Sequence, residues 1–433
     1  MHRLRTMLDW PAIRFFAQIN LFGLGLLGFW TVIDTLLLPD MAARLAPPAL
    51  TASAVGLISV VGVGLAILVQ PVAGRVSDAL QRDDARRPFI ILGLGVLVPG
   101  AVLFGWSPDF WALLAGFTVM QLGTNIAQAA FQALIPDLVD EHQRGVASGV
   151  KNLLSVLGAA IGLLGGAAIH TLTGSTALTL LFLLLLIGAT GLATVRWSPP
   201  SHAGRHTEQA DSIRAALDVR RMSGEFRNVL AQHRTLRLAI VTQFLFMLGT
   251  YPAQRFLLLF LRDRFGNQAE VRASIGGVGA ILLAVIGALA AGALSDAMPR
   301  TSVLVAAIVT GGAGLIVIGF SPTLAVAGLA GGLIAIGLGS FQAVNWALIT
   351  DDLPSGQEAA ALGIANIATA GAGTAAGLFG PLVDGINAVF PQGTYQTLFG
   401  LAGCIALLSI VPLRRIAASS SSASQQQADA PAD

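Results

Sequence analysis

The sequence predicts an all-α integral membrane protein with twelve transmembrane helices, arranged as two six-helix bundles related by pseudo-twofold symmetry. Three observations support this fold class: the apolar composition, the length of the apolar runs, and a repeat that divides the chain into halves. Of the 433 residues, 55% are apolar and 11% are charged, and the mean hydropathy is +0.75. Soluble domains carry roughly 25% charged residues, so this composition excludes a soluble enzyme.

Twelve apolar runs are long enough to cross a bilayer, which requires about 20 residues in a helix. They cover residues 13–38, 50–73, 89–106, 110–135, 146–170, 176–195, 236–261, 273–294, 302–320, 324–349, 359–382 and 394–413. Barrel strands are shorter and alternate in polarity, so they are excluded. The 50 glycines fit helices, because small residues let transmembrane helices approach closely. The first run is too long for a secretory signal, so we expect it to be retained.

Arginines between the runs predict the orientation, because cytoplasmic loops are enriched in positive charge. The loops that we place in the cytoplasm contain Arg3, Arg5, Arg75, Arg82, Arg86, Arg87, Arg144, Arg300, Arg414 and Arg415. The opposite side contains Arg44 and a small group of arginines that nearby acidic residues partly offset. We therefore expect a multi-pass protein of the cell (inner) membrane with both termini in the cytoplasm.

The polar stretches divide the chain into segments. We expect an N-terminal bundle over residues 1–195, a cytoplasmic linker over 196–235, a C-terminal bundle over 236–415 and a disordered tail over 416–433. The tail is rich in Ser, Gln and Ala, a composition typical of disorder. Within the linker, Ile213, Leu217 and Leu230 leave an interfacial helix as the alternative to a solvated segment.

The two predicted bundles share sequence at corresponding places. Gly74-Arg-Val-Ser-Asp78 reappears as Gly292-Ala-Leu-Ser-Asp296, an offset of 218 residues. Ala133-Leu-Ile-Pro-Asp137 reappears as Ala347-Leu-Ile-Thr-Asp351, an offset of 214 residues. Two agreeing offsets of about half the chain, with the same starting side for both halves, indicate a parallel duplication of the kind found in some transporters.

The segment between the second and third runs points to a cytoplasmic gate. The sequence QPVAGRVSDALQRDDARRPFI, residues 70–90, resembles the G-x-x-x-D-x-x-x-x-R-R signature of the major facilitator superfamily. Gly74 permits close helix approach, Asp78 can stabilise a helix N-terminus, and the arginines can pair with Asp137. The expected gate residues are Gly74, Asp78, Arg82, Arg86, Arg87, Asp137, Gly292, Asp296, Arg300 and Asp351. For Arg86 and Arg87 the alternative is simple anchoring on the positive side of the membrane.

Longer stretches resemble one branch of that superfamily, the sucrose transporters and glycoside-pentoside-hexuronide:cation symporters. The resemblance rests on Gln70-Pro followed by Arg86-Arg87-Pro88-Phe89-Ile90 and on Asn125-Ile-Ala-Gln-Ala-Ala-Phe-Gln-Ala-Leu-Ile-Pro-Asp137. The sequence departs from the branch at Gln132, where those sugar transporters carry an arginine. The resemblance implies transport of a sugar or a similar polar solute, coupled to protons or another cation.

Amide side chains recur along the fourth run. Gln121, Asn125, Gln128 and Gln132 are spaced i, i+4, i+7 and i+11, which places them on one helical face. In the corresponding run of the second half, Gln342 and Asn345 are joined by Trp346. Amides both donate and accept hydrogen bonds, which suits hydroxyl-rich ligands, so we expect these residues to bind substrate. The alternative is hydrogen bonding between helices.

The first and seventh runs supply further polar candidates. Asn20, Trp30 and Asp34 lie on roughly one face of the first, and Gln243, Tyr251 and Arg255 belong to the seventh. We expect Asn20 to bind substrate, Trp30, Tyr251 and Trp346 to stack on it, and Asp34 and Arg255 to act in coupling as an ion pair. The alternatives are ordinary packing for the aromatic residues and a solvated position at the outer interface for Asp34.

Lys151 lies in the fifth run beside Asn152, and Asn366 and Thr369 lie in the eleventh. Lys151 is either a ligand or coupling residue, or a partner of Asp137 at the cytoplasmic helix end. We favour the pairing with Asp137.

Metal and cofactor chemistry is not expected. Cys404 is the single cysteine, and the six histidines show no metal-ligand spacing. No G-x-x-x-x-G-K-[ST] motif, catalytic triad or paired-carboxylate pattern occurs, so we expect neither a cofactor nor enzyme activity.

We predict a secondary transporter that works by alternating access. Its expected partners are a small-molecule substrate, a proton or sodium ion and the lipid bilayer, with no nucleic acid, and we expect a monomer. One alternative is an exporter of drugs or metabolites, which should have an apolar cavity with an acidic centre. The other is a membrane protein that serves assembly or sensing, which is favoured if the amides at 121–132 pack against other helices.

Overall fold

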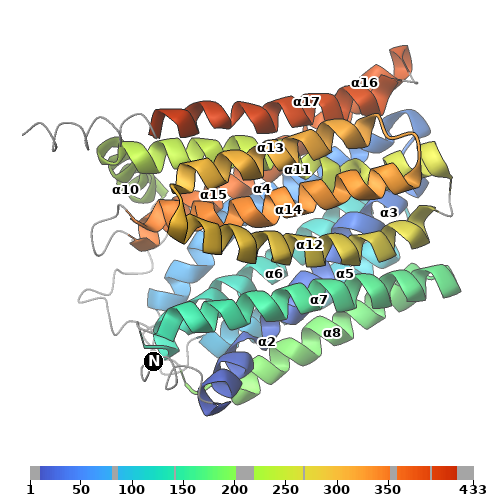
Figure 1. Ribbon diagram of the computed structural model, residues 1–433. Coiled ribbons are helices and arrows are strands. Elements are labelled where there is room, and N and C mark those ends of the chain that lie inside the picture. The colour runs from blue at the N-terminus through green and yellow to red at the C-terminus, as the bar shows by residue number, and fades with distance from the viewer. Residues whose placement is uncertain are drawn as a thin grey trace, which may run out of the picture. The chain divides into compact units, whose positions relative to one another are not determined.

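A computed structural model describes residues 10–79, 86–140, 143–200, 219–266, 269–351, 358–390 and 393–416. Every regular element in these ranges is a helix (Figure 1). The chain forms two compact units, one of residues 1–218 and 270–278 and the other of 219–269 and 279–433. Each unit is described by itself.

The first unit contains the helices of the N-terminal half. They are α2 (Trp10–Val32), the π-helical turn η1 (Ile33–Leu37), α3 (Leu38–Leu45), the 3₁₀ turn η2 (Pro48–Leu50), α4 (Thr51–Ala79), α5 (Arg86–Gly105), α6 (Phe110–Leu138), α7 (Arg144–Thr173) and α8 (Thr176–Trp197). Helix α6 packs against α4 and α5, and α2 packs against α7 and α8.

The second unit contains the later helices. They are α10 (Val219–Gln232), α11 (Arg234–Phe265), most of α12 (Ala269–Ala297), α13 (Arg300–Gly319), α14 (Leu324–Asp351), α15 (Glu358–Gly377), α16 (Phe379–Val389) and α17 (Thr394–Leu408). Helix α11 packs against α15 and α17, and α13 packs against α14 and α17.

Eleven of the described helical segments are long and apolar enough to cross a membrane. They correspond to eleven of the twelve predicted runs. The remaining run, 359–382, is divided between α15 and α16 at Leu378. Pro381 explains the break, since it lacks the N–H that would donate to the carbonyl of Gly377 in a continuous helix.

A second proline shapes the first run. Pro39 follows the π-helical turn Ile33–Leu37, in which the Leu38 N–H donates to the Ile33 carbonyl five residues earlier. A proline disrupts the regular pattern of the preceding turn, and such π turns are frequent at functional positions. Asp34 lies in this turn.

The predicted linker contains a helix, α10, over Val219–Gln232. Its side chains from Arg227 to Gln232 are exposed or half-buried, so both the solvated segment and the interfacial helix stay predictions. Leu230, named for the alternative helix, belongs to α10, whereas Ile213 and Leu217 lie outside the described residues. The predicted tail lies almost wholly outside them as well.

Helices α2 and α7 cross at van der Waals distance of their backbones. A Cβ added to Gly158 of α7 would lie 1.9 Å from the Leu24 carbonyl oxygen, and one added to Gly28 of α2 would lie 2.5 Å from the Gly158 carbonyl oxygen. Only glycine leaves room for this approach. The contact joins α2 and α7, which are two of the three helices that line the cavity described next.

Candidate functional site

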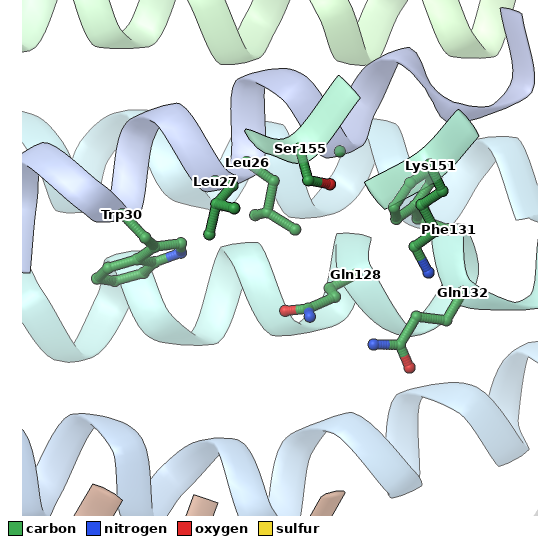
Figure 2. A pocket seen from close by; sticks show the side chains of 9 residues that line it. Leu26, Leu27, Trp30, Gln128, Phe131, Gln132, Lys151 and Ser155 are labelled. Atoms are coloured by element: carbon green, nitrogen blue, oxygen red, sulfur yellow. The ribbon is translucent and has the colours of Figure 1, made fainter. Parts of the chain in front are cut away.

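Three helices of the first unit enclose a cavity of about 190 Å³, which we call the unit 1 cavity. Its lining residues are Gly23, Leu26, Leu27 and Trp30 of α2, Gln128, Phe131 and Gln132 of α6, and Lys151 and Ser155 of α7. Figure 2 shows their side chains around the space.

Helical periodicity explains how each wall is built. The α2 residues are spaced over two turns, and both Gln128 with Gln132 and Lys151 with Ser155 are separated by four positions. Side chains four positions apart lie one above the other on the same face. Each helix therefore presents one stripe of side chains to the cavity.

The two ends of the cavity differ in chemistry. Trp30 lies at one end in Figure 2, where its ring meets Phe117 edge to face with centroids 5.5 Å apart. Lys151 and Gln132 lie at the other end, and the Lys151 ammonium is 5.0 Å from the centroid of the Phe131 ring. The cavity thus combines an aromatic, apolar end with a polar, positively charged end.

Lys151 is the eighth residue of α7, near the start of that helix. Its contact with the Phe131 ring is a cation–π interaction, which contributes about 0.5 to 2 kcal/mol. The pairing with Asp137 that we favoured is not the observed arrangement, because Asp137 contacts Arg86 instead. Among the residues that the structure describes, no carboxylate forms a salt bridge with Lys151.

The predicted amide face divides into two parts. Gln128 and Gln132 line the unit 1 cavity, whereas the Asn125 side-chain amide donates to the Gln121 side-chain oxygen at 3.1 Å. Gln121 and Asn125 are both buried, and Gln121 lies against Gly62 of α4. Of the proposed substrate-binding residues, the structure therefore brings together Trp30, Gln128 and Gln132.

Asn20 forms hydrogen bonds to backbone carbonyl groups of α2 and α7. Its side-chain amide donates to the Phe16 carbonyl at 2.8 Å and to the Ala147 carbonyl of α7 at 3.4 Å, and the side chain is buried. These bonds tie α2 to α7. Asn20 does not line the unit 1 cavity, so its proposed role in substrate binding has no support from the cavity geometry.

The second unit holds a buried amide network. The Asn345 side-chain amide donates to the Gln243 side-chain oxygen at 3.0 Å, and the Gln243 amide donates to Thr369 Oγ1 at 2.6 Å. Helices α14, α11 and α15 are joined by these bonds. Gln342 is exposed, and Tyr251 and Trp346 are half-buried.

This network predicts a cost for one substitution. Gln243→Leu leaves the buried Asn345 amide without its acceptor, so we expect the free energy of unfolding to fall by about 1 to 2 kcal/mol. Gln342→Leu, the same change at an exposed position of α14, is the control and should change stability by less than about 0.5 kcal/mol. Thermal unfolding of the purified variants measures both, and equal melting temperatures would contradict a structural role for the network.

Two of the predicted gate residues of the first half form an ion pair. Arg86 Nε donates to Asp137 Oδ2 at 2.8 Å, and an Arg86 Nη donates to Ser77 Oγ at 2.8 Å. Arg87 donates to the Ser198 carbonyl oxygen after α8. The predicted pairing of an arginine with Asp137 is therefore observed for Arg86, which is 4% exposed, and its role in a gate stays a prediction.

The remaining predicted gate residues are not part of the ion pair between Arg86 and Asp137. A Cβ added to Gly74 or Gly292 meets no heavy atom of the described residues within 4 Å. The roles of both glycines in a gate stay predictions. Asp296 is exposed and Arg300 begins α13. Arg82 lies outside the described residues, and Asp78 and Asp351 belong to the last turns of α4 and α14.

The two proposed coupling residues belong to different units. Asp34 is half-buried in the π-helical turn of the first unit. Arg255 is buried in α11 of the second unit, where an Nη donates to the Gly373 carbonyl of α15 at 3.1 Å. Their pairing stays a prediction.

Sequence reasoning missed part of the cavity. Ser155 and Phe131 were not singled out, and Lys151 was assigned to another partner. The i, i+4 spacing of Lys151 and Ser155 on one apolar helix was the available signal.

Comparisons with known proteins agree on one family. Residues 19–377 match the family model of the Major Facilitator Superfamily. The chain is 28% identical over 236 residues to the inner membrane transport protein YajR of Escherichia coli (strain K12), which covers 54% of this chain and 48% of YajR. It is 28% identical over 125 residues to the sucrose transport protein SUC3 of Arabidopsis thaliana, which covers 24% of this chain and 21% of SUC3. The aligned parts thus span about half or less of these relatives.

Solved structures support the same fold. The nucleoside transporter NupG is similar with a TM-score of 0.70 at 12% identity, covering 92% of this chain and 99% of that one. The human organic anion transporter MFSD10 (TETRAN) is similar with a TM-score of 0.66 at 18% identity, covering 93% of this chain and 99% of that one. At these identities the likeness concerns the twelve-helix fold alone.

Proposed function

The chain belongs to the Major Facilitator Superfamily and is a multi-pass membrane transporter, and from that premise we propose that it moves a small polar solute by secondary active transport. The solute class that we propose is a sugar or glycoside, carried by alternating access with a proton or sodium ion as the coupling ion. We further propose a monomer in the cell inner membrane with both termini in the cytoplasm.

The observation that carries this proposal is the lining of the unit 1 cavity. Gln128, Gln132 and Ser155 offer hydrogen-bond donors and acceptors beside an aromatic ring at Trp30, a combination that suits a hydroxylated ring. Leu26, Leu27 and Phe131 also line the cavity, so it suits a solute with both hydroxyl groups and an apolar ring face.

The same lining weighs against the two alternatives. An exporter of drugs or metabolites should have an apolar cavity with an acidic centre. This cavity has apolar walls at Leu26 and Leu27, but its lining includes a lysine and no acid. A protein for assembly or sensing would have its amides packed against other helices. Gln121 does lie against α4, whereas Gln128 and Gln132 border the cavity. We therefore retain transport of a polar solute as the function.

Asp34 and Arg255 remain our proposed coupling residues. The π-helical turn around Asp34 lies one helical turn beyond Trp30 on the same run, so a protonation event there would sit next to the cavity wall. A carboxyl group that takes up a proton from one side of the membrane and releases it to the other is the simplest coupling device for such a site.

A single substitution tests the binding role. Gln128→Leu should weaken sugar binding about tenfold, because a ligand hydroxyl then loses its partner in the cavity. Equilibrium binding and uptake into proteoliposomes with radiolabelled monosaccharides and disaccharides measure the loss. Gln254→Leu, the same change at an exposed position outside the cavity, is the matched control. Equal affinity of Gln128→Leu and wild-type protein would sink the proposed site.

A further inference from the structure

Lys151 gives the unit 1 cavity a net positive charge. It is the single lysine among 25 lysine and arginine residues in the chain. The other lining residues are neutral. An anionic group that enters this cavity can accept charge-assisted hydrogen bonds from the Lys151 ammonium.

Within the described part of the chain, no residue forms a salt bridge with Lys151. Its ammonium lies 5.0 Å from the centroid of the Phe131 ring, and that ring is itself held edge to face against Phe22 at 5.3 Å. Asp137, the acid that the sequence suggested, is bound to Arg86 at 2.8 Å. An ammonium group has three N–H donors. The aromatic ring attracts the positive charge, but it does not accept a hydrogen bond from each donor.

We propose that the transported solute is a hydroxylated monocarboxylate, such as a sugar acid, whose carboxylate binds the Lys151 ammonium. This inference rests on the proposed function and names its substrate class. Gln128, Gln132 and Ser155 lie on the walls beside Lys151 and bind the hydroxyl groups of the same molecule (Figure 2). The apolar residues Leu26 and Leu27 contact its carbon skeleton.

The charge of the cavity favours a carboxylate over a phosphate. One ammonium balances one negative charge, whereas a phosphate monoester carries about 1.5 to 2 negative charges at neutral pH. A phosphate would therefore leave excess negative charge in a cavity whose lining has one cation.

Three compounds with the same ring test the carboxylate directly. Glucuronate, glucuronamide and glucose are titrated into the purified full-length protein, and binding is measured by calorimetry and by thermal stabilisation. We expect glucuronate to bind at least tenfold more tightly than either neutral compound, since a charge-assisted bond is stronger than a neutral one. Glucose 6-phosphate, added as the fourth ligand, should bind more weakly than glucuronate.

Two variants connect that preference to Lys151. Lys151→Met removes the positive charge and keeps a long, unbranched side chain, so the preference for glucuronate over glucuronamide should fall to less than twofold. Lys151→Arg keeps the charge and should retain most of the preference. Melting curves of both variants without ligand report whether they fold, and Lys151→Arg keeps the test informative if Lys151→Met does not.

The single lysine permits a second readout. After the exposed thiol of Cys404 has been blocked by alkylation, an isothiocyanate modifies Lys151 and the terminal amine, because the remaining basic side chains are arginine or histidine. Glucuronate should protect Lys151 from modification and leave the terminal amine unprotected, as measured by mass spectrometry of the two peptides.

The outcomes separate this inference from the proposed function. Equal binding of the three compounds, or a glucuronate preference that survives Lys151→Met, overturns the carboxylate and leaves sugar transport in place. Tighter binding of glucose 6-phosphate than of glucuronate also overturns it. If glucuronate binds through Lys151 but Gln128→Leu has no effect on any ligand, the amide site of the proposed function fails and the ion pair stands.

Discussion

Arg86→Met is expected to lower the free energy of unfolding of the first unit by about 3 to 5 kcal/mol, because it leaves a carboxylate without its partner among packed helices. Arg86 of α5 is buried, and it contacts both Asp137 of α6 and the buried Ser77 of α4 at 2.8 Å. One guanidinium therefore joins three helices. Surface ion pairs contribute about 0 to 1 kcal/mol, and this pair lies outside that class since Asp137 is 14% exposed and Arg86 4%.

Thermal unfolding of matched variants checks this expectation. Arg196→Met, at an exposed position near the end of α8 in the same unit, should change stability by less than about 0.5 kcal/mol. The double variant Arg86→Met with Asp137→Leu removes both charges and should recover most of the loss. A double variant no more stable than Arg86→Met alone would mean that packing of the arginine, and not its charge, holds the helices.

The sequence predicted the pairing of Arg86 with Asp137 only as one of several, since Arg87 and Lys151 were also candidate partners of this carboxylate. Arg86 and Asp137 are 51 positions apart, and the packing of α5 against α6 selects the pair. Apolar runs of about 20 residues did predict the helices, since a membrane imposes that length on any sequence. The division of residues 359–382 at Leu378 was readable in principle from Pro381, but a proline near a helix start is also compatible with a continuous run.

The cavity was harder to predict. Helical periodicity shows which residues share a face of a helix, but it does not show which helix or cavity that face contacts. Gln121 and Gln132 share a face of α6, yet they are eleven positions apart, or about 16 Å along the helix axis. Gln121 lies against Gly62 of α4, whereas Gln132 borders the cavity that α6 forms with α2 and α7. Only tertiary packing decides which amide meets a ligand and which meets another side chain.

A buried cluster at the other end of α7 illustrates the same limit. Asp40 Oδ2 lies 2.8 Å from Arg44 and 3.8 Å from His170 Nε2, and Asp40 and His170 are buried. Arg44 was interpreted from the sequence as a loop residue alone. His170 lies 130 positions after Asp40 in the chain, so no local pattern relates them.

Gly158→Ala is expected to destabilise the first unit by about 3 kcal/mol, at the upper end of what overpacking usually costs. The added Cβ would lie 1.9 Å from the Leu24 carbonyl oxygen, which belongs to backbone and cannot move without the helix. Helices α2 and α7 must then separate, and with them Trp30 on one wall of the cavity and Lys151 on another. Solute binding should fall together with stability.

The same helix provides the control. A Cβ added to Gly149 of α7 meets no heavy atom of the described residues within 4 Å, and this glycine is exposed. Gly149→Ala should therefore be neutral or stabilise the protein by about 0.5 to 1 kcal/mol, because alanine loses less backbone entropy in a helix. Thermal unfolding and sugar binding of the two variants, measured side by side, separate close helix contact from helix propensity. Helix propensity alone would give both Gly→Ala variants a similar change in the free energy of unfolding. A loss of stability at Gly158 but not at Gly149 therefore indicates that the backbones of α2 and α7 touch at Gly158.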